Sequence, residues 1–205
     1  INYMLVQKHE PWRDEAHHWL ISRDLSYSGI IEEMKYDGHP CLWNLILAPF
    51  AKAGLPYKTL NFISLFFMTA SAVLLLFFSP FQFWMDALLL FSPAFTYYFS
   101  ANARQYSLIP LILMGLAATY RERHRKPFRY GCLIALLVQT HVIMLGMAAI
   151  LALLWLIETI HIESGQSKFL YCLKCLGLPI ISASFLLFQL IQVPGTSTWY
   201  RSDQI

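Results

Sequence analysis

Charge is what this chain lacks most. Only 13% of its 205 residues are Asp, Glu, Lys or Arg, whereas 57% are hydrophobic and the mean hydropathy is +0.49. So little charge excludes a soluble enzyme with one buried core, a disordered chain and a nucleic-acid binder. A disulfide-stapled secreted domain is excluded as well, since only four residues are cysteine. The composition instead predicts a protein that lives in a membrane.

No signal peptide and no internal repeat is visible in the sequence. No basic segment followed by a short apolar core and a cleavage site is present, and no Ser/Gly linker interrupts the sequence. It begins at Ile1 and stops at Ile205 shortly after the polar stretch PGTSTWYRSDQ. We therefore expect residues 1–205 to form a single membrane module that is a fragment of a longer chain. Residues 1–6 fit the end of a first transmembrane helix.

Charged residues are clumped, and the gaps between them predict the helices. Six stretches lack all four charged residue types: 38–51, 59–85, 87–103, 105–120, 130–157 and 175–200. Several reach the roughly 20 apolar residues that cross a bilayer core, which predicts an all-α, polytopic transmembrane bundle over residues 40–193. As one helix, 130–157 would measure about 42 Å, too long for one span without strong tilt. It is expected to be two shorter helices that turn at Thr140-His141.

The segment 121–129, RERHRKPFR, indicates the orientation. Its five basic residues against one Glu predict a cytoplasmic loop. Counting back from this loop places Arg104 on the outer side, and we expect the acidic loop 7–39 there too. An even number of crossings must then separate His39 from Arg104, yet three apolar stretches lie between them, at 40–54, 59–79 and 82–99. One of the three is then a half-span or a re-entrant element; the short 40–54 and the Pro-broken 82–99 are favoured, and the sequence does not say which.

Residues 7–39 form the one long polar segment, with seven of the twelve carboxylates and four of the seven histidines. Within it Trp12, Ala16, Trp19 and Leu20 recur at helical spacing, which is typical of a helix lying on the membrane surface. A second short apolar pattern follows at 30–34. The segment therefore predicts amphipathic juxtamembrane helices in the first outer loop, and that loop is where chemistry is expected.

The strongest local feature is the pair Asp14 and Glu15 beside Arg13. A carboxylate there can act as general base for a hydroxyl nucleophile while the Arg holds an anionic group. A solvated polar face explains the same pattern. Asp14, His17 and His18 stand at i, i+3 and i+4, a spacing that can present metal ligands, although hydrogen-bonded histidines fit it equally. A divalent cation therefore stays open as a cofactor, and the sequence indicates no other.

Arg104 is the most isolated charge, with 17 uncharged residues before it and 16 after it. An arginine in such surroundings is a functional candidate that suits phosphate binding, unless its side chain reaches out to the membrane surface. Asp86 also interrupts apolar sequence and fits a helix end. His141 is either a group of the site or a turn residue. The lone pair Cys172 and Cys175 predicts no function.

Several segments in this order resemble the opening half of the GT-C membrane glycosyltransferases. The match is to the protein-mannosyltransferase-like, family 39-type branch, which includes the lipid A aminoarabinose transferase. The segments are EPWRDEAHHWLISRD, YDGHPCLWNLILAP, YYFSANARQYSLIPLIL and the basic loop before a THV turn. The resemblance covers about residues 3–160.

The resemblance implies roles for individual residues. The family's Asp-Glu pair, whose Asp is the general base, corresponds to Asp14 and Glu15. The family's HPP motif corresponds to 39–41, where Cys replaces the second Pro, and its R-x-Y segment corresponds to Arg104 and Tyr106. The implied donor is a sugar on a polyprenyl phosphate, and the implied acceptor is a lipid, a glycan or a protein. The implied location is the bacterial inner (plasma) membrane, as a multi-pass protein with the site facing outward.

Residues and resemblance together predict a glycosyltransferase that inverts the anomeric centre. Asp14 would be the base, with Glu15 as its catalytic neighbour. The expected substrate-binding residues are Arg13, His39, Arg104 and Tyr106. A transporter or flippase for a lipid-linked substrate is the alternative, since charges such as Arg104 and Asp86 inside apolar sequence often line a substrate path. A metalloenzyme using Asp14, His17 and His18 is a further rival.

Overall fold

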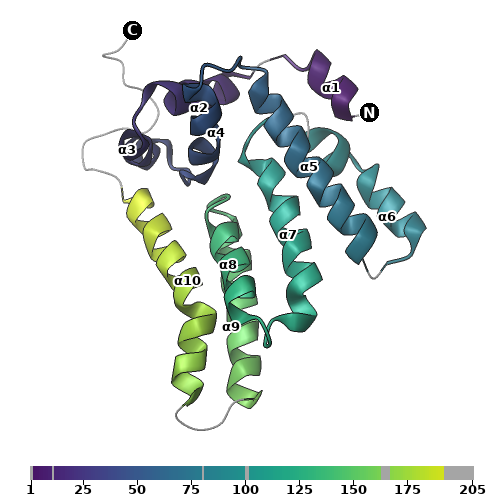
Figure 1. Cartoon of the computed structure of the whole chain (residues 1–205), viewed down its shortest axis with the longest axis vertical. Coiled ribbons are helices and arrows are strands. Elements are labelled where there is room, and N and C mark those ends of the chain that lie inside the picture. The colour runs from purple at the N-terminus through teal and green to yellow at the C-terminus, as the bar shows by residue number, and fades with distance from the viewer. Residues whose placement is uncertain (1, 11, 80, 100–101, 163–166, 192–205) are drawn as a thin grey trace.

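The computed structural model describes residues 2–10, 12–79, 81–99, 102–162 and 167–191, and every regular element within them is a helix (Figure 1). This all-helical result confirms the predicted fold class at the level of secondary structure. The α-helices are α1 Asn2–Lys8, α2 Arg13–Asp24, α3 Tyr27–Asp37, α4 Leu42–Lys52, α5 Thr59–Phe78, α6 Phe83–Leu90, α7 Leu108–Thr119, α8 Pro127–Val138, α9 Met144–Ile162 and α10 Ser167–Leu190. A π-helical turn, η1 Ala94–Tyr98, and two 3₁₀ turns, η2 Gln105–Ser107 and η3 Tyr120–Glu122, complete the set.

Three of the described helices are long and apolar enough to cross a membrane. They are Thr59–Phe78, Met144–His161 and Tyr171–Leu190, with mean hydropathy of 2.1, 1.8 and 1.8. Twenty helical residues measure about 30 Å, the thickness of the hydrocarbon core of a bilayer. Large apolar side chains also cover their outer faces; Phe77, for example, is 77% exposed. Such faces are stable against lipid and unfavourable against water.

The segment 7–39 does form two short helices, as predicted, and both pack against α4 at one end of the molecule (Figure 1). α3 begins at Ser26, whose hydroxyl accepts a hydrogen bond from the Gly29 N–H, and ends at Gly38 in the left-handed conformation that favours glycine. The predicted apolar side of α2 is divided in the structure: Trp19 is buried, whereas Leu20 is 45% exposed. The side of α2 that packs against α4 is largely polar.

The sequence left open which apolar stretch between residues 39 and 104 is not a full span, and the lengths of the helices bear on this point. α4 has 11 residues, about 16 Å, and lies against α2. The stretch 40–54 is therefore too short to span. The stretch 82–99 is not one helix either: it consists of α6 and the π-helical turn η1. These two pieces bring the chain back along α5, so that the Phe99 carbonyl accepts a hydrogen bond from Ser64 Oγ near the start of α5.

The second half of the chain contains the four helices α7 to α10. The 28-residue gap is broken as predicted, since α8 ends at Val138 and α9 begins at Met144. The basic turn between α7 and α8 is fastened to α9, because Arg123 donates two hydrogen bonds to Glu158 at 2.6 and 2.8 Å. α10 begins earlier than the predicted span 175–193, and its described part ends beside α3, where Lys35 Nζ lies 4.2 Å from the Phe188 ring centroid.

α8 and α10 approach each other closely at Gly131. A Cβ atom at this position would lie 2.6 Å from the Cys175 carbonyl oxygen, so only glycine fits without displacing the α10 backbone. Tyr130, beside it, packs edge-on against the ring of Trp155, which ties α9 into the same contact. The three helices therefore form one packed unit below the short helices.

Candidate functional site

Asp14 and Arg104, 90 residues apart in sequence, form an ion pair at 2.9 Å between Nη1 and Oδ2. Asp14 lies in the first turn of α2, where a helix dipole favours an acidic residue. Arg104 precedes η2, and its carbonyl accepts hydrogen bonds from the N–H and hydroxyl of Ser107, which fixes the local backbone. The Asp14 side chain is 52% exposed and that of Arg104 only 11%. An accessible carboxylate thus stands directly beside an enclosed guanidinium.

Three aromatic rings extend the site from Arg104. Its guanidinium carbon lies 5.4 Å from the Tyr106 ring centroid, a cation–π contact. Tyr106 stacks on His141 with ring centroids 5.5 Å apart, and His141 meets His39 edge-on at the same separation. The structure therefore brings together Asp14, Arg104, Tyr106 and His39, which sequence reasoning had singled out in three separate segments.

His141 is the residue of this cluster that sequence reasoning left undecided. It lies in the turn between α8 and α9, far from Tyr106 and His39 along the chain. The signal available in the sequence was the polar triplet Gln-Thr-His inside a long charge-free stretch. That signal located the turn, but the turn's neighbours are set by how the helices pack.

His39 is held by its neighbour Asp37. The left-handed Gly38 between them lets the chain fold back, so that His39 Nδ1 lies 2.9 Å from the Asp37 carbonyl oxygen and 3.1 Å from its carboxylate. The hydrogen bond to this carboxylate raises the pKa of His39. Burial alone would raise the pKa of Asp37, but the His39 hydrogen bond and the nearby histidine charges outweigh it and hold that pKa below its usual value. Both shifts favour the charged forms, an imidazolium beside a carboxylate.

His18 is a structural contact between α2 and α4. Its Nδ1 lies 3.1 Å from Asn44 Oδ1, while Asn44 Nδ2 donates to the His18 carbonyl oxygen. Since the amide nitrogen is used as a donor, Oδ1 accepts and the imidazole proton sits on Nδ1. Burial lowers the pKa of His18 to about 4, so the ring is neutral at physiological pH.

The three weak candidates for metal ligands, Asp14, His17 and His18, are not brought together. Asp14 points to Arg104, His18 points to Asn44, and the exposed His17 lies 3.9 Å from the Asp37 carboxylate. Across the described ranges, no group of three or more His, Cys, Asp or Glu side chains is arranged to hold a metal ion. The spacing i, i+3, i+4 therefore serves three different contacts here.

Glu15 is fully buried, in contrast to its neighbour Asp14. Its carboxylate accepts hydrogen bonds from the Ala103 N–H at 2.8 Å, the Trp12 N–H at 3.2 Å and the Tyr57 hydroxyl at 3.3 Å. His9 Nε2 lies 3.0 Å from it. Burial, and then the Glu15 charge, raise the pKa of Tyr57. The carboxylate is enclosed by protein donors and has no surface for a substrate, so its placement differs from the expected one beside the acceptor.

The hydrogen bond from Ala103 gives Glu15 a second structural role. Ala103 is the residue before Arg104, so the same carboxylate that anchors α2 also fixes the loop that carries the guanidinium. Tyr57, from the connection between α4 and α5, was missed by sequence reasoning, and no pattern around it would have found it. Arg13, predicted to bind substrate, is exposed at the start of α2 and makes no hydrogen bond or ion pair with the described residues.

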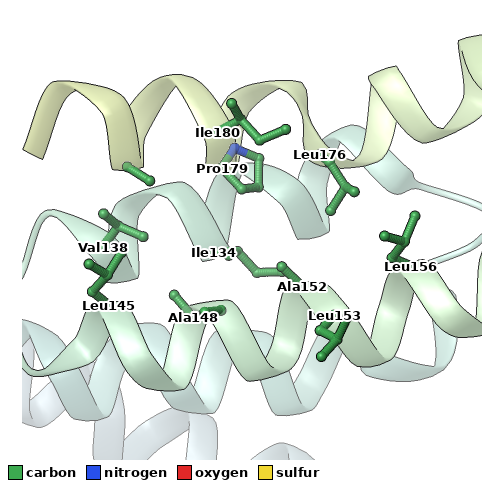
Figure 2. Close-up of a pocket in the computed structure, with 12 residues that line it drawn as sticks. Ile134, Val138, Leu145, Ala148, Ala152, Leu153, Leu156, Leu176, Pro179 and Ile180 are labelled. Atoms are coloured by element: carbon green, nitrogen blue, oxygen red, sulfur yellow. The ribbon is translucent and has the colours of Figure 1, made fainter. Parts of the chain in front are cut away.

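A hollow of different character lies between α8, α9 and α10. It measures about 230 Å³ and is lined by aliphatic side chains and Pro179, as Figure 2 shows. No titratable or hydrogen-bonding side chain contributes to its lining. It can hold apolar groups but offers no chemistry, so the candidate site is the cluster around Asp14 and Arg104.

No protein-family model matches this chain, and comparison with curated proteins and with solved structures gives no match. The resemblance to the GT-C glycosyltransferases thus rests on the sequence segments quoted above. The function has to be argued from the geometry of the site and the apolar helices around it.

Proposed function

We propose that this protein is a membrane glycosyltransferase that moves a sugar from a polyprenyl phosphate donor to an acceptor hydroxyl or amine, with Asp14 as general base. The observation that carries the proposal is the Asp14–Arg104 ion pair, 2.9 Å long, in which the carboxylate is half exposed and the guanidinium nearly buried. A base for the acceptor and a cation for the phosphate are the two groups that this reaction needs side by side.

In the proposed reaction the acceptor oxygen or nitrogen attacks the anomeric carbon of the donor sugar. The bond between this carbon and the phosphate oxygen breaks, and the polyprenyl phosphate leaves with the electron pair. Asp14 takes the proton that the acceptor loses. Arg104 meets the negative charge that develops on the phosphate, which is the kind of stabilisation that contributes most in enclosed sites. A single displacement of this kind inverts the anomeric centre.

The neighbouring residues receive supporting roles. His39, held by Asp37, and Tyr106, beneath the Arg104 guanidinium, are proposed to contact the donor phosphate. Glu15 is proposed to act through position only, by fixing Asp14 and the Arg104 loop relative to each other. Arg13 is proposed as an outer contact for the anionic part of a substrate, because it is exposed directly before Asp14.

The proposed arrangement is a multi-pass protein of a bacterial inner membrane with this site on the outer side. The basic turn 121–129 and the site lie at opposite ends of α7 in Figure 1. A cytoplasmic basic turn, as the positive-inside rule requires, would place Asp14 and Arg104 outside. The acceptor, a lipid, glycan or protein, would then approach from the outer side, and the donor would enter from the surrounding lipid.

The test is sugar transfer from labelled polyprenyl phosphate sugars by the purified protein in liposomes. We expect Asp14→Asn to lower transfer by at least about 100-fold, the usual contribution of a general base. Asp24→Asn is the matched control, because Asp24 lies on the same helix, is exposed and pairs only with its neighbour Arg23. Near-normal turnover in Asp14→Asn would refute the assignment of the base.

A transporter or flippase for a lipid-linked substrate is the second candidate. It is favoured by Asp86, which is 5% exposed on α6 and whose Oδ1 has no hydrogen-bond partner among the described residues. A buried carboxylate with an oxygen that lacks a partner, in an apolar segment, is often part of a substrate path. If a panel of donor sugars is not consumed by the protein, this candidate replaces the transferase.

A further inference from the structure

The ring of His141 contacts both Tyr106, which lies beside Arg104, and His39. It stacks on Tyr106, which lies under the Arg104 guanidinium, and its other side meets the ring of His39. Arg104, His39 and His141 come from three separate segments of the chain.

The hydrogen bonds of His141 determine which of its nitrogens carries a proton. The Ile143 N–H donates to Nδ1 at 3.2 Å, so Nδ1 is the acceptor and a neutral ring holds its proton on Nε2. None of the described residues is a hydrogen-bond partner of that Nε2. Burial, followed by the positive charges of His39 and Arg104, lowers the pKa of His141, which favours this neutral form. The ring is thus an uncharged donor with its N–H unused.

Arg104 has unused donors as well. Its Nη1 is bonded to Asp14, but Nε is buried and has no partner in the described part of the chain. A buried guanidinium N–H without an acceptor is costly unless a ligand supplies one. Arg104 and His141 are both donors of the kind that a negatively charged group with several acceptor oxygens would satisfy. Phosphate has this chemistry, and neutral donors near it avoid the repulsion that a third cation would add.

We propose that His141 is a further substrate-binding residue of the site, whose neutral imidazole donates Nε2–H to an oxygen of a lipid-linked phosphate held by Arg104. This inference rests on the proposed function and names the donor's phosphate ester as the group that His141 recognises. Because the imidazole donates this hydrogen bond in its neutral form, the neutral amide of a glutamine can replace it.

The test measures binding of farnesyl phosphate to the purified protein in detergent micelles. We expect His141→Ala to raise the Kd about tenfold, the loss of one hydrogen bond to a charged group. His141→Gln, which keeps an N–H donor near the position of Nε2, should stay within about threefold of the wild type. His161→Ala is the matched control, because His161 is exposed and, among the described residues, its ring bonds only to the Ile157 carbonyl oxygen one turn earlier on α9.

A second readout separates binding from structure. In protein labelled with ¹⁵N-histidine, the His141 resonances should show the Nε2–H tautomer and should shift when farnesyl phosphate is added. Inorganic phosphate, tested in parallel, should bind at least about tenfold more weakly than farnesyl phosphate. Equal affinity for the two compounds would overturn the lipid-linked source of the phosphate.

The outcomes also distinguish this inference from the transferase. Unchanged farnesyl phosphate binding in His141→Ala, with binding lost in Arg104→Ala, would overturn the role of His141 and leave the transferase standing. Equal losses in His141→Ala and in a stably folded His141→Gln would overturn the neutral-donor role. Binding that depends on His141 in a protein that transfers no sugar would support the phosphate site and refute the transferase.

Discussion

Replacing Glu15 with alanine should destabilise the fold strongly, even though the residue is not expected to touch a substrate. The carboxylate is fully buried and accepts hydrogen bonds from two backbone N–H groups, of Ala103 and Trp12, and from the Tyr57 hydroxyl. Glu15→Ala would leave the buried Ala103 N–H and the part-buried Trp12 N–H and Tyr57 hydroxyl without this acceptor. At about 1–3 kcal/mol for each unsatisfied donor, and with partial relaxation, the expected loss is about 3–5 kcal/mol.

The assay is thermal unfolding in detergent, followed by the exposure of buried cysteines to a thiol-reactive dye. A loss of this size corresponds to a midpoint lowered by roughly 6–20 °C for a chain of about 200 residues. Glu10→Ala serves as the control, since Glu10 is exposed and makes no hydrogen bond with the described residues. Glu15→Gln should fall between the two, because it keeps one acceptor oxygen. Equal midpoints for Glu15→Ala and Glu10→Ala would refute the structural role assigned to Glu15.

Three further results are expected. Gly131→Ala should lower the thermal midpoint, by the equivalent of about 1–3 kcal/mol, because its Cβ would lie 2.6 Å from a backbone carbonyl oxygen of α10. Gly146→Ala, whose Cβ would have nothing within 4 Å, should raise the midpoint slightly. Equal effects of the two substitutions would contradict the close contact at Gly131. The pKa of His39 is raised in the folded protein, so its contribution to stability is complete below the unfolded-state pKa of 6.5 and is lost as the pH rises through the folded-state pKa. The pKa of Asp37 is lowered, so its contribution is present above the unfolded-state pKa of 3.8 and is lost as the pH falls through the folded-state pKa. The wild type should therefore exceed Asp37→Asn in unfolding midpoint most between about pH 4 and 6.5, and a difference that grows above pH 8 would exclude the pair. In transfer assays Arg104→Ala should raise the KM for the donor about 10-fold or more, through loss of charged hydrogen bonds to phosphate, and unchanged donor dependence would remove Arg104 from the site.

The sequence predicted the elements better than their partners. Charge-free gaps and the length limit on a single span located α5, α7 and the turn that contains His141, because these depend on local composition. They could not decide how residues 40–54 and 82–99 are used, because a short apolar stretch has the same composition whether it spans or lies against another helix. Only the packing of α4 on α2 and the return of α6 beside α5 answer that question.

In the candidate site, too, the sequence identified residues better than it identified their contacts. Asp14 and Arg104 were singled out because each is unusual in its own segment, but nothing in either segment predicts that they pair. Glu15 was expected to work beside Asp14 because the two are adjacent in sequence. One residue along a helix is a rotation of about 100°, which is enough to turn Glu15 into the protein while Asp14 stays exposed. Its main partner is a backbone N–H, which leaves no trace in the sequence.

The Glu15–Ala103 hydrogen bond also has a consequence for how the protein is made. The ribosome delivers Glu15 first and Ala103 only 88 residues later, which at ordinary rates takes roughly 4 to 18 seconds. During that interval only one of its two backbone donors, the Trp12 N–H, is present, and the Ala103 N–H is still missing. The loop that carries Arg104 can lock only after α5 and α6 are in place, so a nascent chain cut short before residue 103 would have α2 without its anchor. The site can therefore be completed only late in synthesis, after α5 and α6 have folded.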